Sequence, residues 1–308
     1  MQGIASSRRI LLFLVCLIGS SNPGPSHAND SAPWLAALTK KIPPRQRFAP
    51  TGSEFADRVS GMDEKEREQA ILEQLFQGNL PDFLRSLKPV CLQCQLPDGR
   101  TVSGTVFVMS DYLSIGSDED FLRIPMNLHT AAAIASQFGF TLPTPKIVDA
   151  IYDQSAYHFK PQPLTPGPQM RSTSYYQVHD QKIKEQCMLA SIPQGELVSG
   201  HKKDVVITNR LLQRQGKIAI YGWHQYAGAP IQPLSTVHGS SYADYSHGIR
   251  LVSDTVLIAG KPQSIFEVIE DPKLAKVFSA EGAIHDVRKT LGSLSSGSQG
   301  RLAFLSSP

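Results

Sequence analysis

The chain has 308 residues, with 30 Lys and Arg against 27 Asp and Glu and a formal net charge of +3. Residues 1–28 contain two of the arginines, which leaves 28 basic against 27 acidic side chains. A nucleic-acid-binding protein gathers Lys and Arg on one face. Of the basic pairs, Lys40–Lys41 and Lys202–Lys203 stand out, and both are typical of a solvated surface. We therefore expect no nucleic acid partner.

The first 28 residues have the pattern of a cleavable secretory signal. Arg8 and Arg9 precede the apolar run 10–19, and Ser26-His27-Ala28 precedes Asn29. The run is shorter than the roughly 20 apolar residues that a membrane-spanning helix needs. We expect an exported protein, periplasmic or secreted, with no membrane span after signal removal.

Helical and extended signals alternate along the rest of the chain. Residues 34–41 and 64–77 predict helices, and Asp63 precedes the second, whose apolar residues recur at helical spacing. Residues 89–126 alternate in hydrophobicity between turns, which predicts a small antiparallel sheet. Further helices are predicted at 130–139, from Thr144-Pro145, at 178–187 and at 262–270, with a hairpin over 249–260.

These signals predict an α+β fold of small antiparallel sheets flanked by helices, with a helical N-terminal part and a strand-rich C-terminal part. After the signal, we expect a helix-rich region at 29–160 and a strand-rich functional region at 161–287, in one domain or two. The proline-rich segment 161–168 runs extended between them. The Ser- and Gly-rich end, 288–308, is expected to be disordered.

An oxidising compartment makes Cys91, Cys94 and Cys187 candidates for disulfides, although their pairing stays open. Cys91 and Cys94 have the spacing of a redox motif, but they precede a turn instead of opening a helix. A structural role is therefore favoured for them. A zinc ribbon would need a second close pair, and Cys187 stands alone.

Chemistry-bearing residues concentrate between Gly200 and Val252. Four of the nine histidines lie there, with two aspartates and five aromatic residues: His201, His224, His238, His247, Asp204, Asp244, Tyr221, Trp223, Tyr226, Tyr242 and Tyr245. They lie near the ends of short strand-like runs, and loops held by a rigid sheet commonly carry functional groups. The segment predicts a site, to which the N-terminal region could contribute Asp111 or Asp118. His129, His158, His179 and His285 are isolated and favour structural roles.

His and Asp are ligands that a hydrolytic zinc uses. His201 and Asp204 form H-x-x-D, whereas His238, Asp244 and His247 form H-x5-D-x2-H. This set resembles the His, Asp and His ligands of the zinc D,D-peptidases that trim peptidoglycan, with a first spacing shorter by one residue. The resemblance covers only these residues. If a metal is used, zinc held by His224, His238 and Asp244 is the expected site.

The run Tyr245-Ser246-His247-Gly248-Ile249-Arg250-Leu251 resembles the S-H-G-C-I-R-L signature of the L,D-transpeptidases that cross-link peptidoglycan. Ile249 stands where that family has its nucleophilic cysteine, so the family's activity does not transfer. The resemblance implies a histidine and an arginine presented at a strand end towards a wall peptide that carries a carboxylate.

A metal-free site is the alternative. His201 or His247 would act as general base oriented by Asp204 or Asp244, and Arg250 and Lys203 would stabilise negative charge. Ser246 adjoins His247, but neighbours on a strand point to opposite faces, so this pair is disfavoured as nucleophile and base. The expected catalytic residues are His201, Asp204, His247 and Arg250.

The aromatic residues offer a second route to a bound glycan. Tyr221, Trp223, Tyr242 and Tyr245 could line a groove on which sugar rings stack, although aromatic residues in strands also fill cores. The leading hypothesis is an exported hydrolase of a cell-envelope polymer, a peptidoglycan peptide or glycan. The alternative is a non-catalytic periplasmic or secreted protein that binds saccharide or cell wall. The oligomeric state stays open.

Overall fold

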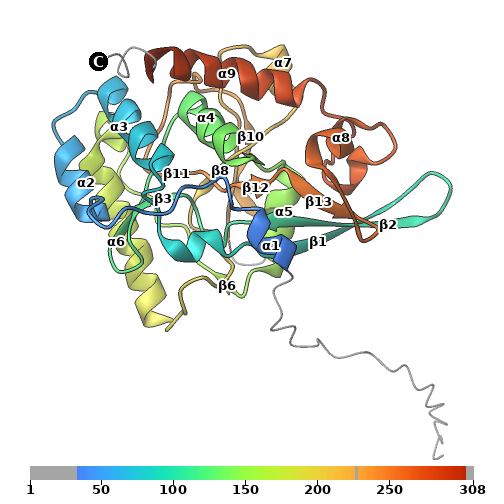
Figure 1. Cartoon of the computed structure of the whole chain (residues 1–308), viewed down its shortest axis with the longest axis horizontal. Helices are drawn as coiled ribbons and strands as arrows, with labels where there is room; N and C mark the ends of the chain where they lie inside the picture. The colour runs from blue at the N-terminus through green and yellow to red at the C-terminus, as the bar shows by residue number, and fades with distance from the viewer. Residues whose placement is uncertain (1–32, 226–227, 303–308) are drawn as a thin grey trace, which may run out of the picture. The chain divides into compact units, whose positions relative to one another are not determined.

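The computed structural model describes residues 33–225 and 228–302, and the predicted signal lies outside them. The described residues have an α+β fold of several small sheets and flanking helices (Figure 1). From Pro33 onward they form one compact unit. Within the described ranges, no helix combines the length and apolarity that a bilayer crossing requires.

Three helices lie in the N-terminal part of the described residues, and capping boxes begin the second and third. They are α1 (Pro33–Ala37), α2 (Gly52–Val59) and α3 (Glu64–Phe76). Asp63 caps α3 by accepting from the backbone N–H of Glu66, whose side chain accepts from the N–H of Asp63 in return. This capping box satisfies amides that lack a partner within the helix. The helix predicted at 64–77 is confirmed.

The central sheet has six strands that come from distant parts of the sequence. They are β1 (Lys88–Gln95), β2 (Thr101–Val108), β5 (Phe140–Thr141), β12 (Val252–Ser253), β13 (Thr255–Ile258) and β14 (Lys261–Ser264). The β1–β2 hairpin confirms the antiparallel sheet predicted there. The hairpin predicted over 249–260 is wrong, because β12 and β13 do not pair with each other: β13 pairs with β14, and β12 pairs with β2 and β5.

Two helices pack beside this sheet and end or begin at predicted signals. Helix α4 (Leu128–Phe138) ends at Gly139, whose φ of 80° suits a residue without a side chain. Helix α5 (Pro145–Gln154) is capped by Thr144, which accepts from the N–H of Ile147. Short segments η1 (Asp82–Arg85), β3 (Ser114–Gly116) and β4 (Phe121–Arg123) connect the N-terminal elements.

The C-terminal half adds a four-stranded sheet and further helices. The sheet consists of β8 (Lys203–Val205), β9 (Ile220–His224), β10 (Pro230–Ser235) and β11 (His247–Gly248). The other elements are β6 (Tyr157–His158), η2 (Pro168–Arg171), α6 (Thr173–Leu189), β7 (Val198–Ser199), α7 (Arg210–Gln213), α8 (Ile265–Glu270) and η3 (Ala275–Val277). The predicted helices at 178–187 and 262–270 correspond to α6 and α8.

The last helix, α9 (Val287–Leu302), forms where we predicted disorder. It packs along α4, as Figure 1 shows at the top of the view. Val287 and Leu291 are buried and Leu294 is partly buried in the core. These residues recur every three to four positions, so one side of a polar segment gains enough apolar contact to fold. Residues 303–308 lie outside the described ranges.

The three cysteines of the described residues are free thiols: Cys91, Cys94 and Cys187. Cys91 and Cys94 lie on β1, and Cys187 lies on α6, where its Sγ is 4.0 Å from a guanidinium nitrogen of Arg123.

Candidate functional site

Three short strands bring the residues of the 200–252 segment side by side. Strand β11 runs parallel to β8, with His247 opposite Lys203. Strand β9 runs antiparallel to β8, with Gly222 opposite Lys203. Paired residues of neighbouring strands face the same side of a sheet. Lys203 and His247 therefore lie on one face, and Asp204 faces the other side.

The backbone of β9 departs from regular strand geometry at this point. Gly222 has a φ of 101° and Trp223 has a φ of 55°. A bulky residue in the left-handed region is a strained outlier, at a cost of order 1–3 kcal/mol. The distortion places Trp223 next to Lys203, whose Nζ lies 4.9 Å from the ring centroid. It also lets Tyr221 and His224 bind the same carboxylate, that of Asp149.

The His247 cluster consists of Lys203, His238, Tyr242, Asp244 and His247. Asp244 Oδ2 lies 3.9 Å from His247 Nε2 and accepts a 3.0 Å hydrogen bond from the Tyr242 hydroxyl. Its other oxygen accepts from the N–H and hydroxyl of Ser246, at 2.8 and 2.6 Å. Three hydrogen bonds thus fix the Asp244 carboxylate beside the imidazole.

An aromatic pair covers the imidazole of His247. The rings of His238 and Tyr242 stack with centroids 4.1 Å apart, and Tyr242 meets His247 edge to face at 5.7 Å. His247 is fully buried, whereas His238 and Tyr242 are half-buried. Both ring nitrogens of His247 lack a hydrogen-bond partner. Such an imidazole is free to bind a water or a substrate proton once the aromatic pair moves.

Burial sets the protonation of the cluster. It lowers the pKa of His247 to about 4, although Asp244 opposes this shift. Burial also raises the pKa of Asp244, but the positive charge of His247 and the Ser246 hydrogen bonds outweigh it, so the pKa lies below its usual range. The pKa of Lys203 is lowered by burial. Near neutral pH, a neutral imidazole thus lies beside a carboxylate.

His201 belongs to a separate, buried ion network. Its Nε2 lies 2.9 Å from Asp111 Oδ1, and Arg123 joins Asp111 to Asp180 at 2.7 and 2.9 Å. When His201 is protonated, two positive charges flank Asp111. The charge of Arg123 keeps the pKa of the Asp111 carboxyl well below its ordinary value, although burial raises it. These side chains have almost no exposed surface. The network joins α6 to β4, to the segment that follows β2 and to the residues just before β8.

Asp204 and Arg250 lie on either side of Tyr112. Asp204 Oδ2 accepts a 2.8 Å bond from the Tyr112 hydroxyl, and the Arg250 guanidinium lies 4.4 Å from the ring centroid. Arg250 is fully buried and donates to the carbonyls of Met109 and Val198. Burial raises the pKa of Asp204 to about 6. In this conformation, Arg250 holds backbone segments together and has no surface to offer a substrate.

His224 lies apart from His238 and Asp244. Its Nε2 and the Tyr221 hydroxyl each lie 2.9 Å from Asp149 Oδ1 on α5. The ring of Tyr152 stacks on His224 and on His158, with centroids 4.5 and 4.2 Å away. Among the described residues, no group of three His, Cys, Asp or Glu side chains could hold a metal ion. The zinc site with His224, His238 and Asp244 stays a prediction.

The four aromatic residues predicted to bind substrate differ in exposure. Tyr221 and Tyr242 are half-buried, while Trp223 and Tyr245 are 5 % and 2 % exposed. Tyr245 packs edge-on near Trp223, and its hydroxyl accepts from the N–H of Leu164. Of the four, Tyr242 belongs to the His247 cluster through its hydrogen bond to Asp244, and Trp223 contacts the cluster through Lys203.

Sequence reasoning missed several partners of the predicted residues. Asp149 and Tyr112 carried no motif that would have revealed their roles. The prediction that Lys202 lies on a solvated surface is wrong, because its side chain is buried and its Nζ donates a 2.7 Å hydrogen bond to the Tyr245 carbonyl. Of the two N-terminal residues predicted as possible contributors to the site, Asp111 pairs with His201, whereas Asp118 accepts a hydrogen bond from the backbone N–H of Phe83. His179, expected to be structural, is buried near Tyr245 with both ring nitrogens unpartnered, and burial lowers its pKa strongly.

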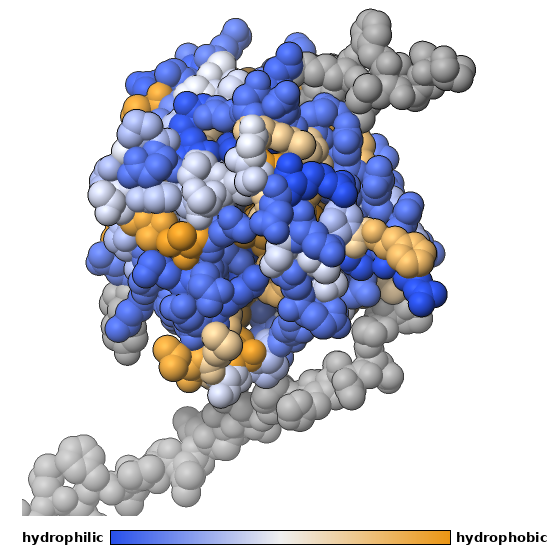
Figure 2. Space-filling model, turned by 90° about the vertical axis from the view of Figure 1, so that its left-hand side faces the viewer, coloured by the Kyte–Doolittle hydropathy of each residue, from blue (hydrophilic) through white to orange (hydrophobic). Residues whose placement is uncertain are grey.

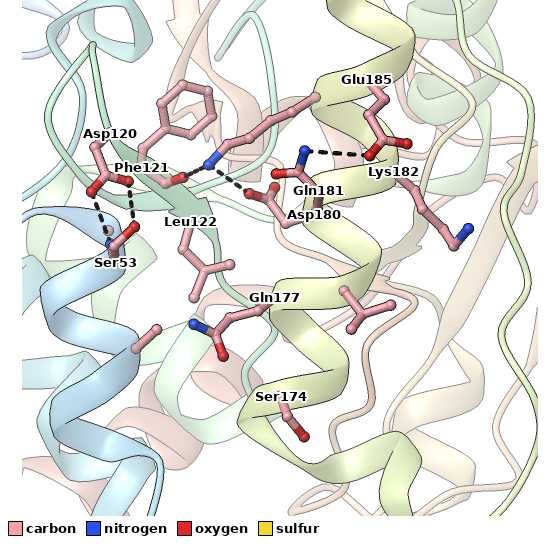
Figure 3. Close-up of a pocket in the computed structure, with 14 residues that line it drawn as sticks. Ser53, Asp120, Phe121, Leu122, Ser174, Gln177, Asp180, Gln181, Lys182 and Glu185 are labelled. Atoms are coloured by element: carbon pink, nitrogen blue, oxygen red, sulfur yellow. Dashed lines mark hydrogen bonds and ion pairs between the residues drawn. The ribbon is translucent and has the colours of Figure 1, made fainter.

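A polar cleft of about 600 Å³ runs between α2 and α6. In Figure 3, α6 forms one side, and Ser53 of α2 with the Asp120–Leu122 segment forms the other. Asp120 accepts from Ser53, and Asp180 at the buried end pairs with Lys184. The volume lies in the range of small-ligand sites. The groups that line it are Ser53, Asp120, Ser174, Gln177, Asp180, Gln181, Lys182, Lys184 and Glu185 with a few apolar side chains.

Comparison with known proteins gives no relative: no family model, no curated protein and no solved structure matches this chain.

Proposed function

We propose that the chain is an exported hydrolase of a cell-envelope polymer, with His247 as its general base. The observation that carries the proposal is the His247 imidazole. Both of its nitrogens lack partners, Asp244 lies 3.9 Å away, and Lys203 occupies the opposing position of the next strand. The secretory pattern and the two peptidoglycan-enzyme resemblances support the compartment and the substrate class.

In this mechanism, a water enters between His247 and the scissile carbonyl when the His238–Tyr242 pair moves aside. His247 takes a proton as the water oxygen attacks the carbonyl carbon, and Asp244 stabilises the imidazolium. The ammonium of Lys203 stabilises the negative oxygen of the tetrahedral intermediate. His247 then returns the proton to the leaving amine as the carbon–nitrogen bond breaks.

The experiment is digestion of purified peptidoglycan by the full chain, with released fragments identified by mass spectrometry. His247→Asn removes the base and is expected to lower the rate by about 10²–10⁴-fold. His285→Asn is the matched control, because His285 is exposed and lies outside the cluster. Equal rates in the folded His247→Asn variant and the unmodified protein would refute the proposal. Glycan binding without any fragment release would support the binding-protein alternative.

A further inference from the structure

Arg171 holds a carboxylate at the edge of the His247 cluster. Its guanidinium pairs with Glu64 and lies 5.1 Å from the centroid of the Tyr242 ring. The side chains of Arg171 and Glu64 are 38 % and 44 % exposed. An ion pair this exposed contributes little to stability. Another carboxylate can therefore replace Glu64 at small cost.

A hydrogen bond from a buried side chain holds the backbone of Arg171 in place. Buried Arg67 donates a 2.8 Å hydrogen bond to the Arg171 carbonyl and lies against the ring of Tyr176. Arg171 Nε is buried without a partner. The guanidinium therefore retains an unused donor beside the one that binds Glu64, and a planar guanidinium can bind a carboxylate through two parallel hydrogen bonds.

In the sequence, Arg171 lies just before the residues of α6 that line the polar cleft. Ser172 caps α6, and Ser174 and Gln177 of its first two turns line the cleft. Figure 2 views the molecule from the side where α2 and α6 lie, and the face is mainly hydrophilic with small separate hydrophobic patches. Amides, hydroxyls and charges suit the repeating amides of a peptide better than an apolar ligand.

We propose that Arg171 binds the carboxylate of a peptide substrate whose remaining residues lie in the cleft along α6. The substrate carboxylate displaces Glu64, and the stacked Tyr242 links this recognition site to Asp244 and His247. The inference rests on the proposed function for its catalytic meaning. The binding itself is independent of turnover.

The test is calorimetric titration of the full chain carrying His247→Asn, which prevents turnover. The probes are N-acetyl-tetra-alanine with a free C-terminal carboxylate and the same peptide as its C-terminal amide. We expect the free acid to bind about ten-fold more tightly than the amide. Arg171→Gln abolishes this preference, and Arg171→Lys retains only part of it.

Two further variants make the test specific. Glu64→Gln removes the competing carboxylate, so it is expected to tighten binding of the free acid and to leave binding of the amide unchanged. Arg214→Gln is the matched control, because Arg214 is exposed on another element. Equal binding of acid and amide, or a preference that survives in folded Arg171→Gln, overturns the inference.

The two proposals fail in different ways. If His247 is not the base, the peptidoglycan digestion is unaffected by His247→Asn while the Arg171-dependent preference persists. If Arg171 is not the recognition residue, the preference for the free acid is absent or survives in Arg171→Gln, while digestion still depends on His247.

Discussion

Tyr112 lies so close to Gly248 that no side chain fits between them: a Cβ on Gly248 would come within 2.5 Å of Tyr112 Cδ1 and 2.7 Å of Lys202 Cβ. Gly248→Ala must displace one of these buried residues. We expect its free energy of unfolding in urea to fall by about 1–3 kcal/mol.

Gly61→Ala is the control for this substitution, since nothing lies within 4 Å of a Cβ there. We expect it to change the free energy of unfolding by less than about 0.5 kcal/mol. Equal stability of the two variants would show that Tyr112 does not pack on Gly248 in solution.

Asp204→Asn is expected to stabilise the protein at alkaline pH. The Asp204 pKa is raised to about 6, against about 3.9 in an unfolded chain. The folded state therefore binds more protons between these values, and stability is lost as the pH rises through 6. An amide still accepts the Tyr112 hydrogen bond without this loss.

Urea unfolding at pH 4.5 and pH 8 measures the effect. Relative to the unmodified protein, Asp204→Asn should gain about 2 kcal/mol between the two conditions. Asp153→Asn, at an exposed position, should show no such gain. A gain of the same size in both variants would assign the effect to surface charge.

The rate of polymer hydrolysis should depend on pH through two groups of the His247 cluster. His247 must be neutral to take a proton, and its pKa is lowered to about 4, so kcat/KM should rise through that pH and level off. Lys203 must stay charged, and its pKa is also lowered. The rate should therefore fall at a pH below the ordinary lysine value of about 10.4.

The variant Lys203→Met separates the two limbs of this profile. The alkaline limb should disappear, and the plateau should fall by about 10²-fold, because the charge that stabilises the oxyanion is removed. A profile whose alkaline limb is unchanged in Lys203→Met would exclude Lys203 from the reaction.

The acid–base mechanism predicts activity without a bound metal. We expect a chelator to leave the rate of polymer hydrolysis unchanged, and elemental mass spectrometry of the purified full chain to give well under one zinc per chain. About one zinc per chain, lost in folded His238→Ala and His224→Ala variants, would instead support the metal site predicted from the sequence.

The helix at 64–77 and the helix start at Thr144-Pro145 were predictable because the interactions that place them are local. Asp63 and Thr144 each accept a hydrogen bond from the backbone N–H three positions further along the chain. The segment 288–302 was misjudged because its few apolar residues become helical only against α4, a contact that composition does not reveal.

The sequence indicated which segment carries the candidate site, but not which side chains contact one another in it. His238, Asp244 and His247 are close in sequence, and the structure brings them together. His201 and Asp111 are 90 positions apart, and His224 finds Asp149 on a helix. Such pairs depend on long-range strand and helix packing. The positive φ of Trp223, which reorients two site residues, has no sequence signature.

The placement of β12 has a consequence for the order in which the fold can form during synthesis. Strand β12 lies between β2 and β5 in the central sheet, and β13 also pairs with β2. The sheet that begins with residues 88–108 thus stays incomplete until residues beyond 250 have been made. Pairing of such distant segments is slow, because a long loop must close first. The nascent chain therefore lacks its central sheet until late in synthesis.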